Sequence, residues 1–114
     1  MKIGDIVNDG IVFQINPDGK SGLMAMKDDL ANKYDWSMAI AKGIVLGDGR
    51  RLPSKEEPNL LYEQKDIVGG FGSCYYWSST ETGDNYAWSQ GFKDGHQYDG
   101  CKDYVFRVRV IRAF

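Results

Sequence analysis

Side chains suited to binding a partner are concentrated in the last third of the chain. Tyrosine, serine, aspartate, asparagine and glycine are the residues that antibody loops use, because tyrosine buries a large amphipathic area at low entropic cost while the small polar residues adapt their hydrogen bonds. Residues of this character occupy Asp84, Asn85, Tyr86, Ser89, His96, Tyr98, Asp99, Cys101, Asp103, Tyr104 and Phe106. We expect them to form an exposed ligand-binding surface. The competing interpretation is that tyrosine and aspartate are simply common in turns and at sheet edges.

Enzyme chemistry finds little support in the same stretch. His96 is the only histidine, and it lies among glycines and polar residues. The chain contains no HExxH, GxSxG or P-loop pattern, which are the short motifs that carry metal, nucleophile or phosphate chemistry. A lone histidine in a loop is more typical of a solvated side chain or a partner contact than of a general base. The sequence therefore predicts a protein without catalytic residues.

Metal binding is not expected either. Asp99 and Asp103 are close in sequence, but no third carboxylate lies near them and their spacing is not that of an EF-hand. Calcium takes about six to eight oxygen ligands, which two aspartates do not supply. We expect ordinary surface acids here, and no metal or other cofactor.

Two cysteines, Cys74 and Cys101, allow one disulfide at most. A bridge would tie a polar loop to the edge of a sheet. Two free thiols are the favoured interpretation, because a domain of 114 residues buries a sufficient core without a covalent staple.

Composition limits the classes of partner. With 14 Lys and Arg against 16 Asp and Glu, the formal net charge is -2, so no basic field attracts nucleic acid or anionic lipid. No apolar run approaches the roughly 20 residues of a membrane helix, so membrane insertion is not expected. A secretory signal is not expected either, because Met1 and Lys2 lead straight into Gly4 and Asp5 without an apolar run. Localisation stays open; display on a cell or virion surface would require an upstream or partner segment, as in a larger display protein.

The elements that would position the binding residues are three strands near the C-terminus. Residues 75–80, 86–92 and 104–111 are rich in aromatic and β-branched types, whereas 93–103 contain turn formers and no apolar run. The pattern predicts three strands and a polar loop. Because side chains alternate along a strand, Tyr86, Trp88 and Phe92 should share one face, with Ala87, Ser89 and Gly91 on the other. In the last strand Phe106, Val108 and Val110 should oppose Val105, Arg107 and Arg109.

The N-terminal half predicts a hairpin. Residues 10–15 and 22–26 read as strands, and Asn16-Pro17-Asp18-Gly19 between them is a strong turn signal because Pro presets φ and Gly accepts positive φ. A further turn is expected at Asp9 and Gly10.

Two short helices follow. Apolar residues recur at helical spacing over 35–42, with Asp35 as N-cap and Gly43 or Gly47 as the stop. Ser54 and Glu57 have the spacing of a capping box, from which a second helix should run to about Lys65. The expected core comprises Leu60, Leu61, Trp77, Trp88 and Val108.

Several stretches in one order resemble a known family. YYWSSTE, AWSQGF and the terminal RVRVIRAF, together with GIVFQI, RLPSKEE and NLLYEQK upstream, are similar to the C-terminal domain of bacterial collagen-like adhesins, the Lcl C-terminal family. That family is a branch of the C-type-lectin-like fold shared with formylglycine-generating enzymes and with variable proteins of diversity-generating retroelements. The likeness covers nearly the whole chain. It departs from the family at Pro58, where leucine is usual, so the second helix should begin less tightly.

The resemblance implies a fold and a function. The fold would be α+β and C-type-lectin-like, a single domain over residues 1–114 with a twisted, mainly antiparallel sheet and two flanking helices. Segment 10–15 would pair with 104–111, so that the first and last strands lie close together. The function would be non-enzymatic binding of a protein or glycan receptor on another surface. Alternatives are an enzyme of the formylglycine-generating type, whose paired-cysteine copper site nothing local supports, and a structural cap of a surface fibre.

Codon chemistry of the retroelements bears on the same residues. Randomising the adenines of AAC codons gives Asn, Tyr, His, Asp, Ser, Cys, Gly or Phe among others, but never Lys, Gln, Trp, Glu or Met. Every residue of the expected binding surface can be reached in this way. Gln90, Lys93, Gln97 and Lys102 cannot, and they interleave with the others like fixed scaffold.

One tripeptide imitates a lectin site. Glu57-Pro58-Asn59 spells the sequence with which calcium-dependent lectins bind mannose-type sugars. The Trp-Asn-Asp partner of such sites is missing, since the nearby tryptophan runs are Trp77-Ser78-Ser79 and Trp88-Ser89-Gln90. The tripeptide also lies in a predicted helix, so we expect no calcium-dependent sugar site.

Overall fold

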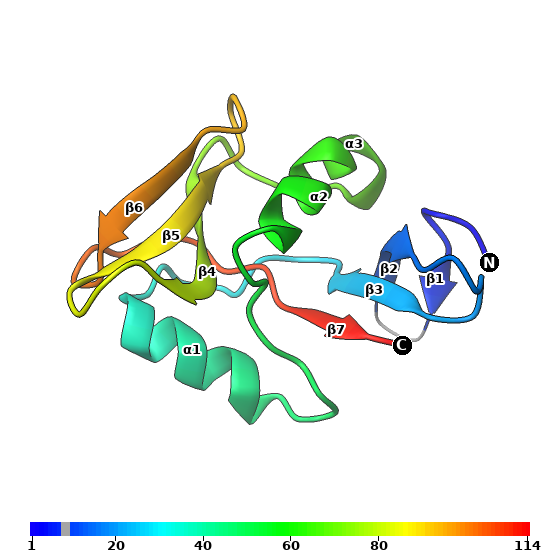
Figure 1. Ribbon diagram of the computed structural model, residues 1–114, viewed down its shortest axis with the longest axis horizontal. Helices are drawn as coiled ribbons and strands as arrows, with labels where there is room; N and C mark the ends of the chain where they lie inside the picture. The colour runs from blue at the N-terminus through cyan, green and yellow to red at the C-terminus, as the bar shows by residue number, and fades with distance from the viewer. Residues whose placement is uncertain (8–9) are drawn as a thin grey trace.

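Two antiparallel sheets and three short helices make up the domain in a computed structural model that describes residues 1–7 and 10–114. The elements in chain order are β1 (Ile6–Val7), β2 (Gly10–Ile15), β3 (Gly22–Met26), α1 (Trp36–Val45), α2 (Glu57–Glu63), α3 (Lys65–Val68), β4 (Tyr75–Glu81), β5 (Tyr86–Gly91), β6 (Gln97–Cys101) and β7 (Ile111–Ala113). One sheet has the order β1-β2-β3-β7 and the other the order β4-β5-β6. Figure 1 shows them at opposite ends of the molecule, with α2 and α3 between them and α1 beneath the second. The α+β class is confirmed.

The N-terminal hairpin forms as the turn signal predicts. β2 and β3 pair antiparallel across the turn at residues 16–19, where Gly19 has a φ of 72°. The Asp18 carboxylate accepts the backbone N–H of Lys20 and of Ser21, which is the way aspartate stabilises a turn. The turn expected at Asp9 lies outside the described residues.

Both predicted helices are present. Asp35 caps α1 by accepting the Met38 N–H at 2.9 Å. Gly43 does not stop this helix; it is buried against Leu52, and α1 continues to Val45 before Gly47 turns the chain with a φ of 74°. At α2 the Glu57 side chain accepts the Ser54 N–H at 2.7 Å, whereas no side chain caps the helix from the other direction. Only half of the capping box is therefore made. Pro58 lies in the first turn of α2, where its missing N–H is tolerated.

The core consists of two clusters that meet at β4. One packs Phe13, Leu61 and Phe92 with Tyr76, between the four-stranded sheet and the helices α2 and α3. The other packs Ala39, Leu52, Ala87, Val108 and Val110 with Trp77, between α1 and the three-stranded sheet. Successive residues of a strand point to opposite faces, so Tyr76 and Trp77 enter different clusters. Of the expected core, Leu61, Trp77 and Val108 are buried, while Leu60 and Trp88 are half-buried.

Three expectations about the C-terminal region are wrong. Residues 93–103 are not a loop throughout, because Gln97–Cys101 form β6 against β5. Residues 104–111 do not form a continuous strand, and 10–15 do not pair with them. β7 is short and pairs with β3, which separates it from β2.

The segment before β7, residues 106–110, joins the two sheets. Its carbonyls at Val108 and Val110 accept the N–H groups of Leu30 and Met26, and its Arg107 exchanges hydrogen bonds with β4 through Tyr75 and Trp77. Because its hydrogen bonds go to two different partners, it makes only isolated bridges at Phe106 and Arg107. It runs between the sheets and does not extend either of them. No helix among the described residues has the length and apolar character to cross a membrane.

Candidate functional site

The register of β5 and β6 decides which binding residues meet. Tyr86 lies opposite Cys101 and Ser89 opposite Tyr98. Beyond the ladder, the Lys102 N–H donates to the Asn85 carbonyl at 2.9 Å, and the Lys102 ammonium donates to the Asp84 carbonyl at 2.9 Å. The β4–β5 turn and the end of β6 are thereby held together.

Seven of the expected binding residues are exposed along β6 and at this end of it. We call them the β6 rim: Asp84, Asn85, Tyr86, Tyr98, Asp99, Asp103 and Tyr104. Cys101 and Phe106 lie among them but are half-buried. His96 is exposed, but it sits in the β5–β6 turn at the other end of β6. The structure therefore brings most of the set together and leaves His96 apart.

Ser89 does not belong to an exposed surface. Its side chain is only 2% exposed and its hydroxyl donates to the Tyr98 carbonyl at 2.9 Å. The expected orientation of β5 is inverted, since Ala87 and Ser89 face the second core cluster while Tyr86 and Trp88 face outward. The prediction placed the aromatic face of β5 in the core because large aromatic side chains are usually buried. Instead, β5 buries its small residues against Trp77 and Val108.

An aromatic platform supports one side of the rim. Tyr75 contacts Tyr98 and Phe106, with ring centroids 5.5 Å apart in both cases, and Tyr104 lies 6.0 Å from Phe106. Phe106 itself packs on Trp77 at 4.5 Å. Gly100 lets it come close, because a Cβ there would lie 2.8 Å from a Phe106 ring carbon. The exposed tyrosines thus rest on rings that the core fixes.

The rim is acidic as well as aromatic. Among the described residues, none of Asp84, Asp99 and Asp103 makes an ion pair. Lys102, which precedes Asp103 in the chain, is engaged by Glu81 at 2.6 Å and by the Trp36 ring at 4.5 Å. Desolvation, the adjacent Tyr104 and the Asp99 charge raise the pKa of the Tyr98 hydroxyl, so it stays a neutral donor at physiological pH. Three uncompensated carboxylates beside three exposed tyrosines can bind cations through both charge and ring faces.

The tripeptide Glu57-Pro58-Asn59 is not available for a ligand, because the Glu57 carboxylate is engaged by another side chain and by the backbone of this chain. Arg51 donates to both Glu57 oxygens, at 2.6 and 2.9 Å. Burial alone would raise the pKa of the Glu57 carboxyl, but the hydrogen bonds from Arg51 and from the Ser54 amide outweigh it and lower the pKa. Over the part of the chain that the structure describes, no group of three or more His, Cys, Asp or Glu could hold a metal ion.

The two cysteines are free and half-buried. Cys74 lies beside Phe92, whose N–H donates to its carbonyl, while Cys101 lies opposite Tyr86. These neighbours are at the two ends of β5, so the cysteines are roughly 20 Å apart at the rise of an extended strand. They cannot form the close pair that a disulfide or a two-cysteine copper site needs.

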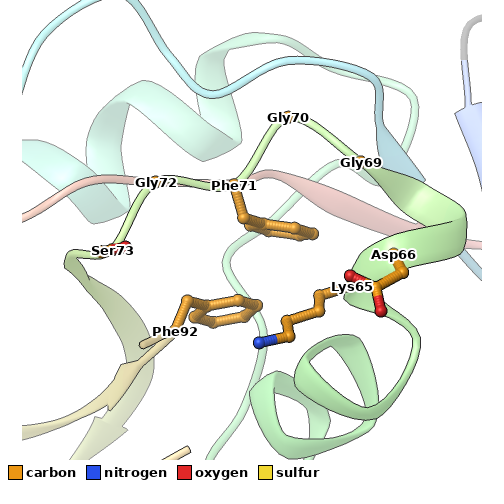
Figure 2. Close-up of a pocket in the computed structure, with 8 residues that line it drawn as sticks. All are labelled: Lys65, Asp66, Gly69, Gly70, Phe71, Gly72, Ser73 and Phe92. Carbon is orange, nitrogen blue, oxygen red and sulfur yellow. The ribbon is translucent and has the colours of Figure 1, made fainter. Parts of the chain in front are cut away.

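A cavity of about 320 Å³ lies near the Cys74 end of β5, away from the rim. Figure 2 shows Phe71, Phe92 and Lys65 around it, with the backbone of residues 69–73 along one side. The rings of Phe71 and Phe92 stack on each other at 4.4 Å, and Arg109 covers Phe71 at 4.0 Å. Because both faces of Phe71 are occupied, it offers no free face for a planar ligand.

Sequence reasoning missed a buried polar network behind this cavity. Arg109 is only 1% exposed; its Nε donates to Asp29 at 2.9 Å and its Nη1 to the carbonyls of Met26 and Gly69. The Tyr76 hydroxyl donates to Asp29 at 2.6 Å and accepts the Gly72 N–H. The sequence does contain a signal for this network, because Arg109 lies within an apolar run. Strand alternation alone, however, predicts that Arg109 faces solvent. The network fixes the segment before β7 to β4, which in turn carries β5 and β6.

No protein-family model matches the chain, and no curated protein is significantly similar to it.

Proposed function

We propose that this chain is a non-enzymatic ligand-binding or adhesion domain whose β6 rim binds a protein or glycan receptor on another surface. One observation carries the proposal: seven polar and aromatic side chains are exposed on β6 and around the end of the sheet where β5 begins and β6 finishes, next to a buried β5. Their composition is that of a binding loop, in which rigid tyrosines anchor and small polar residues adapt. Their support comes from β5, where Ala87, Ser89 and Gln90 are buried.

The finer assignment, a C-type-lectin-like fold related to the Lcl C-terminal family, belongs to the same proposal. It is supported by the quoted motifs and by their places in the α+β domain: YYWSSTE is β4, and AWSQGF covers β5 after its first residue and ends at Phe92. The terminal RVRVIRAF carries Arg109 and β7. The domain would be displayed on a bacterial or phage surface, and its receptor would lie on another surface.

Retroelement variability is the second part of the proposal. Every rim residue can be reached from a randomised AAC codon. Of the residues that cannot, Gln90 is buried, Gln97 donates to the Lys55 carbonyl, and Lys102 holds Glu81 and the Asp84 carbonyl. Lys93 is exposed and makes no such contact with any residue that the structure describes. This division between scaffold and display favours a variable protein, and a near-copy of the 3′ coding sequence beside a reverse transcriptase gene would test it.

Replacing three rim side chains at once tests the binding function. Simultaneous Tyr98→Ala, Asp99→Ala and Tyr104→Ala should abolish whatever binding a glycan array or a screen of surface ectodomains detects, because aromatic anchors each carry about 2 kcal/mol or more of such interfaces. Asp99 and Tyr104 have no core role, and exposed residues of this kind change stability by less than about 0.5 kcal/mol. Tyr98 packs on Tyr75, so the melting temperature should fall only slightly.

The matched control carries the same number of changes on another face. Ile44→Ala, Val45→Ala and Asp28→Ala alter two apolar side chains and one acid, all exposed and away from the rim. This variant should bind like the wild type. If the rim variant binds normally, or if both variants lose binding equally, the rim is not the binding surface.

A further inference from the structure

The outer edge of β6 has hydrogen-bonding groups that no described residue uses. The sheet order is β4-β5-β6, so β6 has a neighbour on one side only. Figure 1 shows β6 as the outermost strand, with no other element beside its free edge. A bare strand edge is a template for pairing with another chain, and proteins usually protect such edges.

The register identifies the groups that point outward. At the two ends of the ladder, Gly91 donates to the His96 carbonyl and Lys102 donates to the Asn85 carbonyl. Hydrogen-bonded and non-hydrogen-bonded pairs alternate in an antiparallel ladder. The intervening pairs of β5 with Tyr98 and with Gly100 are therefore hydrogen-bonded, and Gln97, Asp99 and Cys101 direct their N–H and C=O groups away from β5.

These outward groups remain free within the described chain. The Cys101 carbonyl accepts the Tyr104 N–H, but no hydrogen bond among the described residues uses the backbone N–H or C=O of Gln97 or Asp99. Asp99 lies at the centre of the strand and is exposed. An added strand could therefore form hydrogen bonds with the backbone N–H and C=O groups of Gln97 and Asp99 without displacing any internal contact.

The side chains along this edge specify the chemistry of the added strand. Asp99 shares a face with Trp88, its partner across the ladder, and has no ion-pair partner among the described residues. Tyr98 points to the opposite face, against the ring of Tyr75. A strand whose residues alternate between basic and apolar would place a cation beside Asp99 and an apolar group beside Tyr98.

A second copy of this chain fits the edge poorly. In a symmetric antiparallel pairing centred on β6, the two Asp99 side chains would lie opposite each other, and like charges at directly opposed positions are destabilising. The acidic edge favours a partner of opposite charge.

We propose that β6 binds its partner by strand addition, and that the partner is an extended segment of another protein in which Lys or Arg alternates with apolar residues. This rests on the proposed function, because it names the kind of receptor that the rim takes and the way in which it is held. Backbone hydrogen bonds would supply affinity, and Asp99 with Tyr98 would supply selectivity. Charges on the rim would also steer association, so binding should weaken as salt rises.

Amide exchange on the wild-type protein tests the binding mode directly. The probe is a blocked peptide of about eight residues in which lysine and valine alternate. In the free protein the amides of Gln97 and Asp99 should exchange quickly and those of Tyr98 and Gly100 slowly, because only the latter donate to β5. Addition of the peptide should slow exchange at Gln97, Asp99 and Cys101 and leave Tyr98 and Gly100 unchanged. A glutamate–valine peptide should produce no protection, and a lysine–glycine peptide should produce much less because glycine disfavours a strand.

Two substitutions of Asp99 separate the contribution of its charge to peptide binding from that of its backbone N–H. Asp99→Asn keeps the N–H and should weaken binding of the lysine–valine peptide about two- to fivefold, as expected for an exposed ion pair. Asp99→Pro also removes the outward N–H, which should cost about a further three- to tenfold. Proline is tolerated where a strand N–H faces solvent. A melting curve checks that it folds, and the exchange data on the wild type stand if it does not.

The outcomes separate this inference from the proposed function. Peptide binding without protection of Gln97 and Asp99 would overturn strand addition and leave the rim as a binding surface. Failure of the lysine–valine peptide to bind would overturn the inference, while the three-residue rim variant still tests the function against its own ligand. Protection of these amides by self-association, seen as a dimer in sedimentation, would show that a second copy is the occupant and would overturn the basic partner.

Discussion

The guanidinium of Arg109 is buried, and it donates hydrogen bonds to Asp29 and to two backbone carbonyls. Removing one member of such a buried pair leaves the other uncompensated, so the arrangement is costly to disturb. Tyr76 completes it by donating its hydroxyl proton to the remaining Asp29 oxygen. The three side chains come from segments far apart in sequence, and their contacts hold β4, the strand that carries β5 and β6.

Ionisation of Tyr76 gives this network a measurable pH dependence. Burial, followed by the hydrogen bond to Asp29, raises the pKa of Tyr76 well above its usual value. A tyrosine in the unfolded chain ionises near pH 10. The folded state then holds a proton that the unfolded state loses, so the free energy of unfolding should fall above about pH 10, by up to about 1.4 kcal/mol per pH unit.

Urea denaturation of the wild type and of Tyr76→Phe across pH 8 to about 11 measures this effect. The variant should be less stable at pH 8, since it loses a buried hydrogen bond, and its stability should fall less steeply above pH 10. All other groups titrate in both proteins and cancel in the difference. Parallel curves would mean that Tyr76 ionises as readily in the folded protein as in the unfolded one.

The hairpin of β2 and β3 requires glycine at position 22, because a side chain there would clash with the paired strand. A Cβ at Gly22 would lie 2.1 Å from the Gln14 carbonyl oxygen, which belongs to the backbone of the paired strand next to a register shift. The strand would have to separate there to admit even a methyl group. Gly22 also exchanges hydrogen bonds with Phe114, so the same displacement would disturb the last residue of the chain.

Gly22→Ala should therefore destabilise the domain by about 1 to 3 kcal/mol, the range for a side chain forced into filled space. Gly83→Ala is the matched control. A Cβ at Gly83 meets nothing within 4 Å and its φ is not positive, so this change should be neutral or slightly stabilising. Equal melting temperatures for the two variants would contradict the close approach of β2 to Gly22.

Elements with strong local signals were predictable from the sequence, and elements defined by distant partners were not. The turn at residues 16–19 and the Asp35 cap form through contacts within a few residues, so their patterns identified them. β6 has almost no strand propensity; Tyr98 is its one favourable residue, and it exists because β5 offers a complete ladder. Residues 104–110 have high propensity but no continuous partner, so they form isolated bridges.

The candidate site was predicted in composition more than in geometry. Exposure of the rim followed from residue type, but the burial of Ser89 depends on which face of β5 meets the second core cluster. The distance of His96 from the rim follows from the pairing of β6 with β5, which places His96 in the turn at the other end of β6. The orientation of β5 is decided by packing on Trp77 and Val108, which no local pattern records.

The two sheets have different roles in the molecule: one holds the chain termini and the other carries the β6 rim. The four-stranded sheet holds both termini at one end, and Figure 1 shows the three-stranded sheet with β6 at the other. The rim thus faces away from both ends of the chain. The segment before β7 and the Arg109 network join the sheets, so the rim is presented on a rigid support. A preorganised surface loses less entropy when it binds.

A map of substitution effects over the whole chain should separate the β6 rim from the residues that hold the fold. A library of single substitutions at every position, displayed on cells, is sorted once for protease resistance and once for binding to the ligand that the screen identifies. Positions where substitution removes binding but leaves resistance intact should cluster at Tyr86, Tyr98, Asp99, Asp103 and Tyr104. Ser89, Gly100 and Arg109 should lose resistance and binding together. If the binding-only positions instead cluster around Phe71 and Lys65, or on the outer face of α1, the β6 rim is not the functional surface.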